Sequence, residues 1–380
     1  MKDTLPETTS FINLNKPFGD LAQRYLLAML AREQKKARDL VFEVIDHNGS
    51  IKEIYLNVFK PVMYEIGRLW QTGKISVGQE HYCTNAIQVT MSMLYPRLFN
   101  GTSCGKRMLA ACAQGELHEM GLRMVTDFFE MDGWNTDYLG ANTPSDSIVR
   151  AIEEKSVDVL AISVTMYFNL EKAQEIINAV HRATGATKIK ILLGGYPFKI
   201  DDQLWQKLGA DGCADNAQEA IALAEKLTSK QTLTITQNSA RSQVHCPVSQ
   251  DTLTKFNSQL LSVEQEVLEQ CLSLDNPQGT MGPGAEAMIR NGLGFISKMF
   301  QSSMMYGSEK IVEDELAWCK TFLPENGVSM IMILNTLERY FEALKSRLPL
   351  VTFEEVRPYL TAVIDRQRII VKDIRKTNAR

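Results

Sequence analysis

The sequence has no long apolar run, no closely spaced cysteine pair and no excess of positive charge. No stretch reaches the roughly 18 apolar residues of a membrane span, and no apolar run follows a basic start as in a secretory signal. The seven cysteines form no CxxC pair, which is typical of buried thiols in a reducing compartment. A net charge of −4 argues against a nucleic-acid surface. We therefore expect a cytoplasmic protein that binds no membrane.

Residues 18–100 carry apolar side chains at helical spacing. One long helix is expected to run up to the stop signal Asn48-Gly49, and Ser50 is expected to cap the next helix. Pro61 should kink or divide that second helix, because proline removes a backbone donor. A further helix follows, so this region predicts an antiparallel four-helix bundle with short loops.

The rest of the chain divides into an α/β region and an all-helical region. Residues 104–230 alternate short apolar runs ("RMLAACA", "VDVLAISV", "KIKILLGG") with helical segments, which predicts a Rossmann-like parallel sheet covered by helices. Residues 229–250 are polar and have the pattern of a linker. Residues 251–375 return to helical periodicity and are long enough for a separate core. The sequence therefore predicts a multidomain α and α/β protein.

The α/β region carries polar residues and glycines where its strands are expected to end. The first strand runs into an E-x-H-x-x-G loop, and two further elements follow after forty-one and twenty-eight intervening positions. Ligands of parallel sheets bind at this edge, on the loops that follow the strands. The residues in question are Glu116, His118, Gly121, Ser163, Thr165, Gly194 and Gly195.

This spacing resembles the cobalamin-binding domain of methionine synthase, the corrinoid proteins and the B12 mutases. The resemblance implies that His118 replaces dimethylbenzimidazole as the lower cobalt ligand, and that Glu116, where many relatives have Asp, orients its ring. Gly121, Gly194 and Gly195 would let the backbone approach the nucleotide tail. The hydroxyls of Ser163 and Thr165 would bind the buried base.

In the helical region, Trp70 is followed by nine residues and then Glu80-His81. This pattern resembles the cap of cobalamin-dependent photoreceptors of the CarH type. The resemblance implies that Trp70 packs on the adenosyl group of adenosylcobalamin, that Glu80 contacts it, and that His81 binds cobalt after photolysis. Corrinoid methyl carriers have similar helical caps, so a methyl-transfer cap is the alternative. We expect no direct DNA binding, because no helix-turn-helix domain precedes the bundle.

The C-terminal region has no histidine, since the last of the five lies at position 245. A histidine-ligated haem is therefore excluded, which leaves Cys319 or Tyr306 as the alternative haem ligands. The order of bundle, B12 domain and globin-like helices resembles the photocobilins, which carry cobalamin and the bilin biliverdin. For a non-covalent bilin the candidate contacts are Arg290, Lys298, Tyr306, Asp314 and Trp318.

These resemblances favour a B12-dependent photoreceptor that is not an enzyme and that signals to an unknown downstream protein or by forming homo-oligomers. A corrinoid carrier, as the subunit of a methyltransferase system, is the alternative function. A third hypothesis is a B12-responsive regulator whose C-terminal helices bind a protein.

Overall fold

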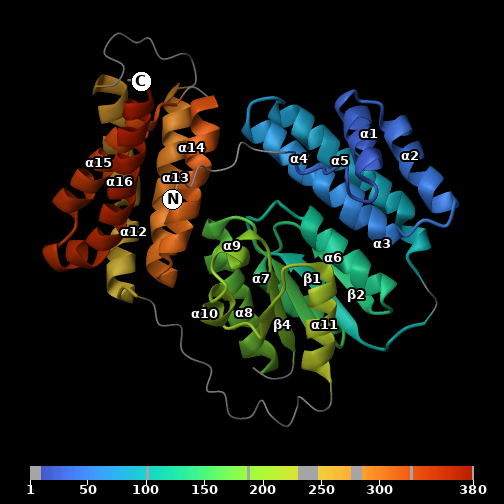
Figure 1. Cartoon of the computed structure of the whole chain (residues 1–380). Helices are drawn as coiled ribbons and strands as arrows, with labels where there is room; N and C mark the ends of the chain where they lie inside the picture. The colour runs from blue at the N-terminus through green and yellow to red at the C-terminus, as the bar shows by residue number, and fades with distance from the viewer. Residues whose placement is uncertain are drawn as a thin grey trace. The chain divides into compact units, whose positions relative to one another are not determined.

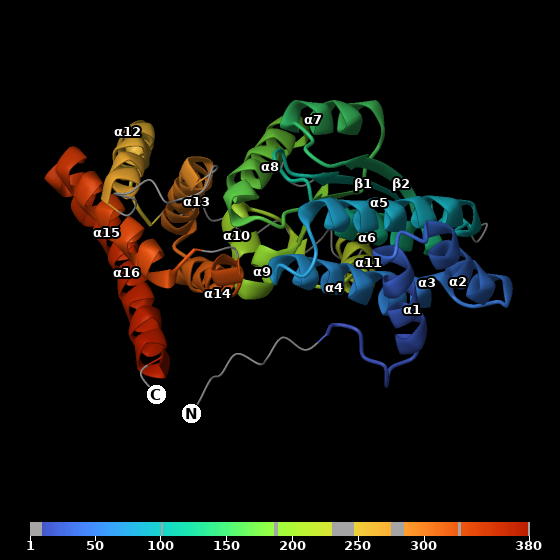
Figure 2. The same cartoon turned by 90° about the horizontal axis from the view of Figure 1, so that it is seen from above.

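The computed structural model describes residues 10–99, 102–185, 189–229, 247–274, 285–325 and 328–378. Most of the predicted linker therefore lies outside the described residues. The described chain separates into two compact units. The first unit comprises the N-terminal helices together with Met124–Asn135, and the second comprises Lys106–Arg123 and Thr136–Arg380. Figure 1 labels the helices and strands, and Figure 2 shows the same cartoon turned by 90°.

The first unit is a bundle of amphipathic helices. Its elements are α1 (Gly19–Leu30), α2 (Gln34–Asp46), α3 (Ile51–Ile54), η1 (Tyr55–Phe59), α4 (Lys60–Gln71), α5 (Val77–Leu94) and η2 (Tyr95–Arg97). In its core the ring of Phe59 packs against the rings of Tyr25 and Tyr55, with centroid distances of 5.6 Å and 5.4 Å. The hydroxyl of Tyr55 donates to the buried carboxylate of Asp127, at 2.8 Å, which holds the second half of α6 (Met120–Met131) in this unit.

Two local features of the bundle differ from the sequence prediction. The expected long first helix is divided into α1 and α2, because Arg32 adopts a positive φ of 60° that an α-helix cannot contain. Pro61 does not divide the chain, because α3, η1 and α4 follow one another without a break. Pro61 lies in the first turn of α4, after the π-helical turn η1, where a residue without a backbone N–H is tolerated. The cap at Ser50 and the stop at Asn48-Gly49 are confirmed.

The second unit begins with a parallel sheet whose strand order is β2-β1-β3-β4-β5. The strands are β1 (Arg107–Cys112), β2 (Asn135–Gly140), β3 (Val159–Ser163), β4 (Lys190–Gly194) and β5 (Gly212–Cys213). The central strands are buried on both faces, as their continuous apolar runs predict. Cys112 pairs with Ser163, and Ser163 pairs with Gly194, so β1, β3 and β4 end level with one another. The loops that follow these strands therefore meet at one edge.

Helices connect and flank these strands. They are α7 (Ser145–Glu154), η3 (Tyr167–Asn169), α8 (Leu170–Thr184), α9 (Tyr196–Ile200), α10 (Leu204–Leu208) and α11 (Ala217–Thr228). Figure 2 shows α7 and α8 running side by side next to the sheet. Alternation of strand and helix with parallel pairing is the Rossmann-like arrangement that the sequence predicts.

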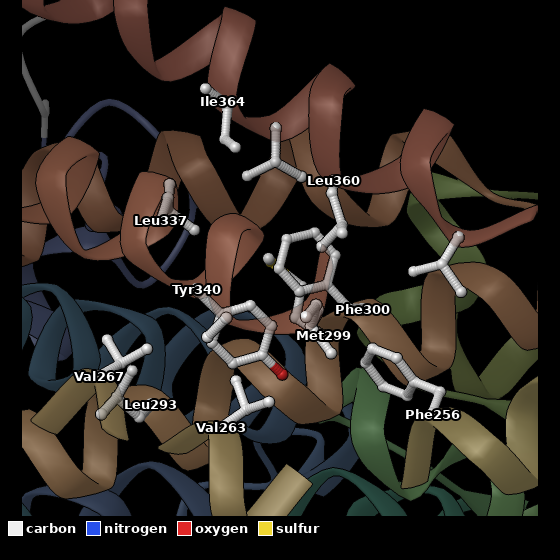
Figure 3. Close-up of a cluster of buried hydrophobic side chains, with 14 of the residues drawn as sticks. Phe256, Val263, Val267, Leu293, Met299, Phe300, Leu337, Tyr340, Leu360 and Ile364 are labelled. Carbon is white, nitrogen blue, oxygen red and sulfur yellow. The ribbon is translucent and has the colours of Figure 1, made fainter. Parts of the chain in front are cut away.

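The second unit continues into five long helices. They are α12 (Gln250–Leu274), α13 (Ala285–Tyr306), α14 (Glu309–Glu325), α15 (Met330–Arg347) and α16 (Leu350–Asn378). Their apolar faces form one buried cluster in which the rings of Phe300 and Tyr340 stack with centroids 5.8 Å apart (Figure 3). The hydroxyl of Tyr340 lies 2.8 Å from that of Ser297, which satisfies the polar end of this buried ring. None of the helices within the described ranges is both long and apolar enough to span a membrane.

The cluster of Figure 3 should dominate the stability of the C-terminal helices. Phe300 is 1% exposed, and replacing it with Ala should lower the free energy of unfolding by about 3–5 kcal/mol through lost burial and a residual cavity. Leu261→Ala on α12, where Leu261 is 83% exposed, is the matched control and should change it by less than about 0.5 kcal/mol. Denaturant unfolding of both variants measures the difference. Equal effects would contradict the placement of Phe300 in a packed core.

Candidate functional site

A buried carboxylate organises the loop that follows β1. Glu116 is 0% exposed, and its Oε1 atom lies 2.5 Å from Nδ1 of His118 and accepts a hydrogen bond from the backbone N–H of the same histidine at 3.0 Å. The turn is shaped by Gly115, which has a φ of 85° and donates its N–H to the side-chain oxygen of Asn142. Glu116 and His118 therefore form a fixed pair at the end of β1.

The second oxygen of Glu116 binds the loop that follows β3. Its Oε2 atom accepts hydrogen bonds from the backbone N–H groups of Thr165, at 2.8 Å, and Met166, at 2.9 Å. The side-chain amide of Asn169 donates a third bond to the same oxygen, at 3.1 Å. A single carboxylate thus ties together two loops that lie about fifty residues apart in the sequence.

These donors decide the charge of Glu116. Burial alone would raise the pKa of the carboxyl, but the hydrogen bonds from the His118 ring and from the backbone N–H groups of Met166, His118 and Thr165 outweigh it and lower the pKa to about 2. Glu116 is therefore an anion at neutral pH. An anionic acceptor at Nδ1 fixes the proton of His118 on that nitrogen, so Nε2 is the atom with an electron pair for a metal.

His118 presents one imidazole to its surroundings, with 60% of its side chain exposed. Within the described part of the chain, no group of three or more His, Cys, Asp or Glu side chains is arranged to hold a metal ion. A single imidazole suits a metal whose other positions are supplied by a macrocycle, as in haem or a corrinoid. The donor set therefore fits the cobalt of cobalamin better than it fits a free metal ion.

The three glycines near this edge differ in their surroundings. A Cβ atom on Gly121 would meet no atom within 4 Å, and one on Gly194 would be in ordinary van der Waals contact with the carbonyl oxygen of Ala214 at 3.8 Å. Gly195 differs, because its φ is 122° and a Cβ there would lie 1.8 Å from the carbonyl oxygen of Val164. The chain itself thus requires glycine at 195, a reason that the sequence did not reveal. Ser163, 8% exposed, ends β3 in register with Gly194.

The candidate residues of the helical bundle belong to the first unit. Trp70 is half-buried near the end of α4. Glu80 and His81 lie in the first turns of α5, where Nδ1 of His81 is 2.5 Å from Oε2 of Glu80 and the histidine side chain is 69% exposed. Glu80 also accepts a hydrogen bond from the hydroxyl of Thr84 at 2.8 Å. The structure thus brings Glu80 and His81 together as a second carboxylate–imidazole pair.

The candidate residues of the C-terminal helices each have partners in the structure. Arg290 binds Glu286 of its own helix and Gln265 of α12. Asp314 instead accepts hydrogen bonds from the hydroxyls of two tyrosines of the sheet region. The hydroxyl of Tyr306 donates a hydrogen bond to the side chain of Gln174 at 3.3 Å. The ring of Trp318 stacks on that of Phe322, with centroids 4.5 Å apart. The ammonium of Lys298 lies 4.9 Å from the ring centroid of Phe168.

Sequence reasoning missed Asn169 and Asn142. Asn169 is 5% exposed and donates a hydrogen bond to Glu116. Asn142, whose own φ is 51°, accepts a hydrogen bond from the backbone N–H of Gly115 and so stabilises that turn. Asn142 stands in an Asn-Thr-Pro sequence after β2, which is a turn signal. Asn169 carries no local signal, because only the fold brings it to the carboxylate.

The charge of Glu116 should make stability depend on pH. The pKa of Glu116 is lowered from 4.5 to about 2 in the folded protein, so its ionised carboxylate contributes to the free energy of unfolding. That contribution is complete above pH 4.5 and is lost as the pH falls toward 2. Glu116→Gln should cost on the order of 3 kcal/mol at neutral pH, since its amide meets backbone donors, and should flatten this part of the pH profile. Denaturant unfolding between pH 2 and pH 7 measures both effects. Asp202→Asn, at an exposed position, is the control, and an unaltered profile in the Glu116→Gln variant would contradict the assignment.

Comparisons with known proteins identify two B12-binding regions in this chain. A model of the B12 binding domain matches residues 106–224, and a second model, also described as a B12 binding domain, matches residues 21–95. Dimethylamine corrinoid protein 1 of Methanosarcina mazei is 26% identical over 178 residues, which cover 46% of this chain and 81% of that protein. A corrinoid protein of Desulfitobacterium hafniense is 25% identical over 210 residues, covering 53% of this chain and 91% of that one.

Among solved structures, the monomethylamine corrinoid protein of Methanosarcina barkeri superposes with a TM-score of 0.50 at 20% sequence identity. The match covers 56% of this chain and 100% of that chain, so it shows a shared fold over about half of the present protein. Neither B12-binding model extends beyond residue 224. Residues 21–95 and 106–224 are therefore B12-binding domains, one helical and one built on a Rossmann-like parallel sheet, in a chain homologous to corrinoid proteins.

Proposed function

We propose that the protein is a corrinoid carrier that takes part in methyl transfer and binds cobalamin through His118. The observation that carries this proposal is the Glu116–His118 pair at the end of β1, where a buried anion fixes the tautomer of an exposed imidazole. The dimethylamine and monomethylamine corrinoid proteins among its relatives support methylamines, or similar small methyl donors, as the source of the methyl group. A separate methyltransferase would then perform the chemical step.

Each residue of the site would have a separate role in holding the corrinoid. His118 would bind the cobalt through Nε2, and Glu116 would hold the ring in place and raise its basicity. Gly121 and Gly194, which have no side chains, would let the backbone approach the nucleotide tail, and the hydroxyls of Ser163 and Thr165 would bind its base. When bound, the corrinoid would supply the cobalt centre that carries the transferable group.

His118→Ala should remove the nitrogen ligand of cobalt. In protein that carries 15N-labelled histidine and is loaded with cob(II)alamin, we expect the splitting due to the labelled nitrogen in the electron paramagnetic resonance spectrum to disappear, even if the vitamin's own base binds cobalt instead. The affinity for cobalamin should fall by about tenfold or more, because a metal–imidazole bond is lost. His47→Ala, which removes an exposed histidine of the bundle, should change neither. An unchanged splitting from the labelled nitrogen in the His118→Ala variant would disprove the proposed role of His118.

A photoreceptor is the second candidate, and the Glu80–His81 pair favours it. The exposed imidazole of His81, oriented by a carboxylate, is a second group able to bind cobalt after light breaks the bond to an adenosyl group. Trp70 would pack on the adenosyl group of adenosylcobalamin. The signal would pass to an unknown cytoplasmic partner or to self-association, without direct DNA binding.

A bilin such as biliverdin belongs to this second candidate. It would bind the C-terminal helices, which would then form a globin-like domain. In this region the ring of Trp318 packs between those of Phe295 and Phe322, with centroid distances of 6.3 Å and 4.5 Å. The ammonium of Lys298 lies over the ring of Phe168, which contacts Phe295. Flat rings and a cation are the groups that a bilin with two propionates requires. Arg290, Tyr306 and Asp314 remain candidate contacts of such a ligand.

Trp70→Ala separates the two functions. For a carrier, methyl transfer from the methylcobalamin-loaded protein should stay within about twofold of the wild type, because the reacting methyl group is small and needs no aromatic cover. For a photoreceptor, adenosylcobalamin-loaded protein should change its spectrum and oligomeric state under green light, and Trp70→Ala should alter the photoproduct. Absorption spectra before and after illumination, with and without biliverdin, measure this. We expect the carrier result, and a light-dependent oligomeric state would overturn it.

A further inference from the structure

The six residues after β3, Val164–Asn169, bind the site on one side and the C-terminal helices on the other. Toward the site, the backbone N–H groups of Thr165 and Met166 and the amide of Asn169 donate to Oε2 of Glu116. The segment therefore holds one oxygen of this carboxylate through three donors, while Oε1 of the same carboxylate holds His118. We call these residues the 164–169 segment.

The other side of this segment is attached to α13 and α14. The hydroxyl of Tyr167 donates to Oδ2 of Asp314 at 3.2 Å, and the carbonyl oxygen of Tyr167 accepts a hydrogen bond from the hydroxyl of Ser302 at 3.3 Å. The ring of Phe168 lies edge-on to Phe295, with centroids 6.2 Å apart. Tyr167 is 3% exposed and Ser302 is 6% exposed, so the contact between them is buried, while the hydrogen bond from Tyr167 to Asp314 is partly buried.

These polar contacts make the position of the segment depend on both neighbours. A phenol held by a carboxylate forms a charge-assisted hydrogen bond. Its loss removes the Asp314 partner of the Tyr167 hydroxyl, whereas Asp314 keeps the hydrogen bond that the hydroxyl of Tyr196 donates at 2.8 Å. A displacement of Tyr167 moves the adjacent N–H groups of Thr165 and Met166, which are bound to Glu116. The hold of Glu116 on the His118 ring then changes as well, since both oxygens belong to one planar group.

We propose that Tyr167 and Asp314 are positioning residues, through which the C-terminal helices set how firmly His118 binds cobalt. The route runs from Asp314 to Tyr167, through the 164–169 segment to Glu116, and from Glu116 to His118. The inference rests on the proposed function only in that His118 is the lower cobalt ligand. Coupling between two sites is reciprocal, so a change of ligation at cobalt also changes how tightly α14 docks on the segment.

The test uses the full chain, made with 15N-labelled histidine and loaded with cob(II)alamin, so that splitting by a histidine nitrogen is distinguished from splitting by the vitamin's own base. Tyr167→Phe keeps the buried ring and removes only the hydroxyl that binds Asp314. We expect it to shift the equilibrium between histidine-bound and histidine-free cobalt by roughly threefold to tenfold toward the free form, seen as a loss of nitrogen splitting in the electron paramagnetic resonance spectrum. Asp314→Asn should shift it in the same direction. Ser302→Ala, which removes the contact to the Tyr167 carbonyl, supplies a further variant if Asp314→Asn prevents folding.

Lys207→Gln is the matched control. Lys207 donates to the carbonyl oxygen of Tyr306 at 2.8 Å, so it also joins the sheet region to α13, but it does not touch the 164–169 segment. This variant should keep the wild-type spectrum. The wild-type nitrogen splitting in folded Tyr167→Phe and Ser302→Ala variants would overturn the proposal, as would an equal shift in Lys207→Gln. If the wild-type protein itself shows no nitrogen splitting that depends on His118, the proposed function fails instead, and the two failures are thereby distinguished.

Discussion

The buried carboxylate of Glu116 is the interaction on which the candidate site depends. A charge without solvent is tolerated only when donors replace the water, and donors from two loops do so for Glu116. The same donors keep its pKa near 2, so the group stays ionised and fixes the His118 tautomer at any physiological pH. Glu116 thus links its own charge, the geometry of the two loops that bind it and the orientation of the His118 imidazole.

The parallel sheet makes this interaction achievable. Cys112, Ser163 and Gly194 pair across β1, β3 and β4, so the three loops begin from one level. The apolar strands below them are buried and give the loops a rigid base. Gly195 contributes in a different way, because its positive φ lets the loop after β4 pass close to the carbonyl of Val164. The glycine at 195, which the motif suggests is there for a ligand, is therefore required by the backbone of the chain itself.

The C-terminal helices lie outside the part of the chain that the matched B12-binding models cover. The matched relatives cover about half of the chain, and neither B12-binding model reaches these helices. Yet α13 and α14 contact the 164–169 segment through Ser302, Phe295 and Asp314, and that segment also binds Glu116. A helical region so attached can sense or alter the state of the site without contacting the histidine. The inferred role of these helices is therefore compatible with either of the two proposed functions.

The sequence alone determined the helical periods, the buried strands, the helix caps and the E-x-H-x-x-G loop, because each is a local pattern of side chains along the chain. It could not show that Arg32 divides the first helix, that a π-helical turn precedes Pro61, or that Gly195 is required by Val164. It also gave no sign of Asn169 or of the Tyr167–Asp314 contact. The Tyr167–Asp314 contact joins residues 147 positions apart, and Asn169 lies 53 positions from Glu116, so only the tertiary fold decides that these groups meet.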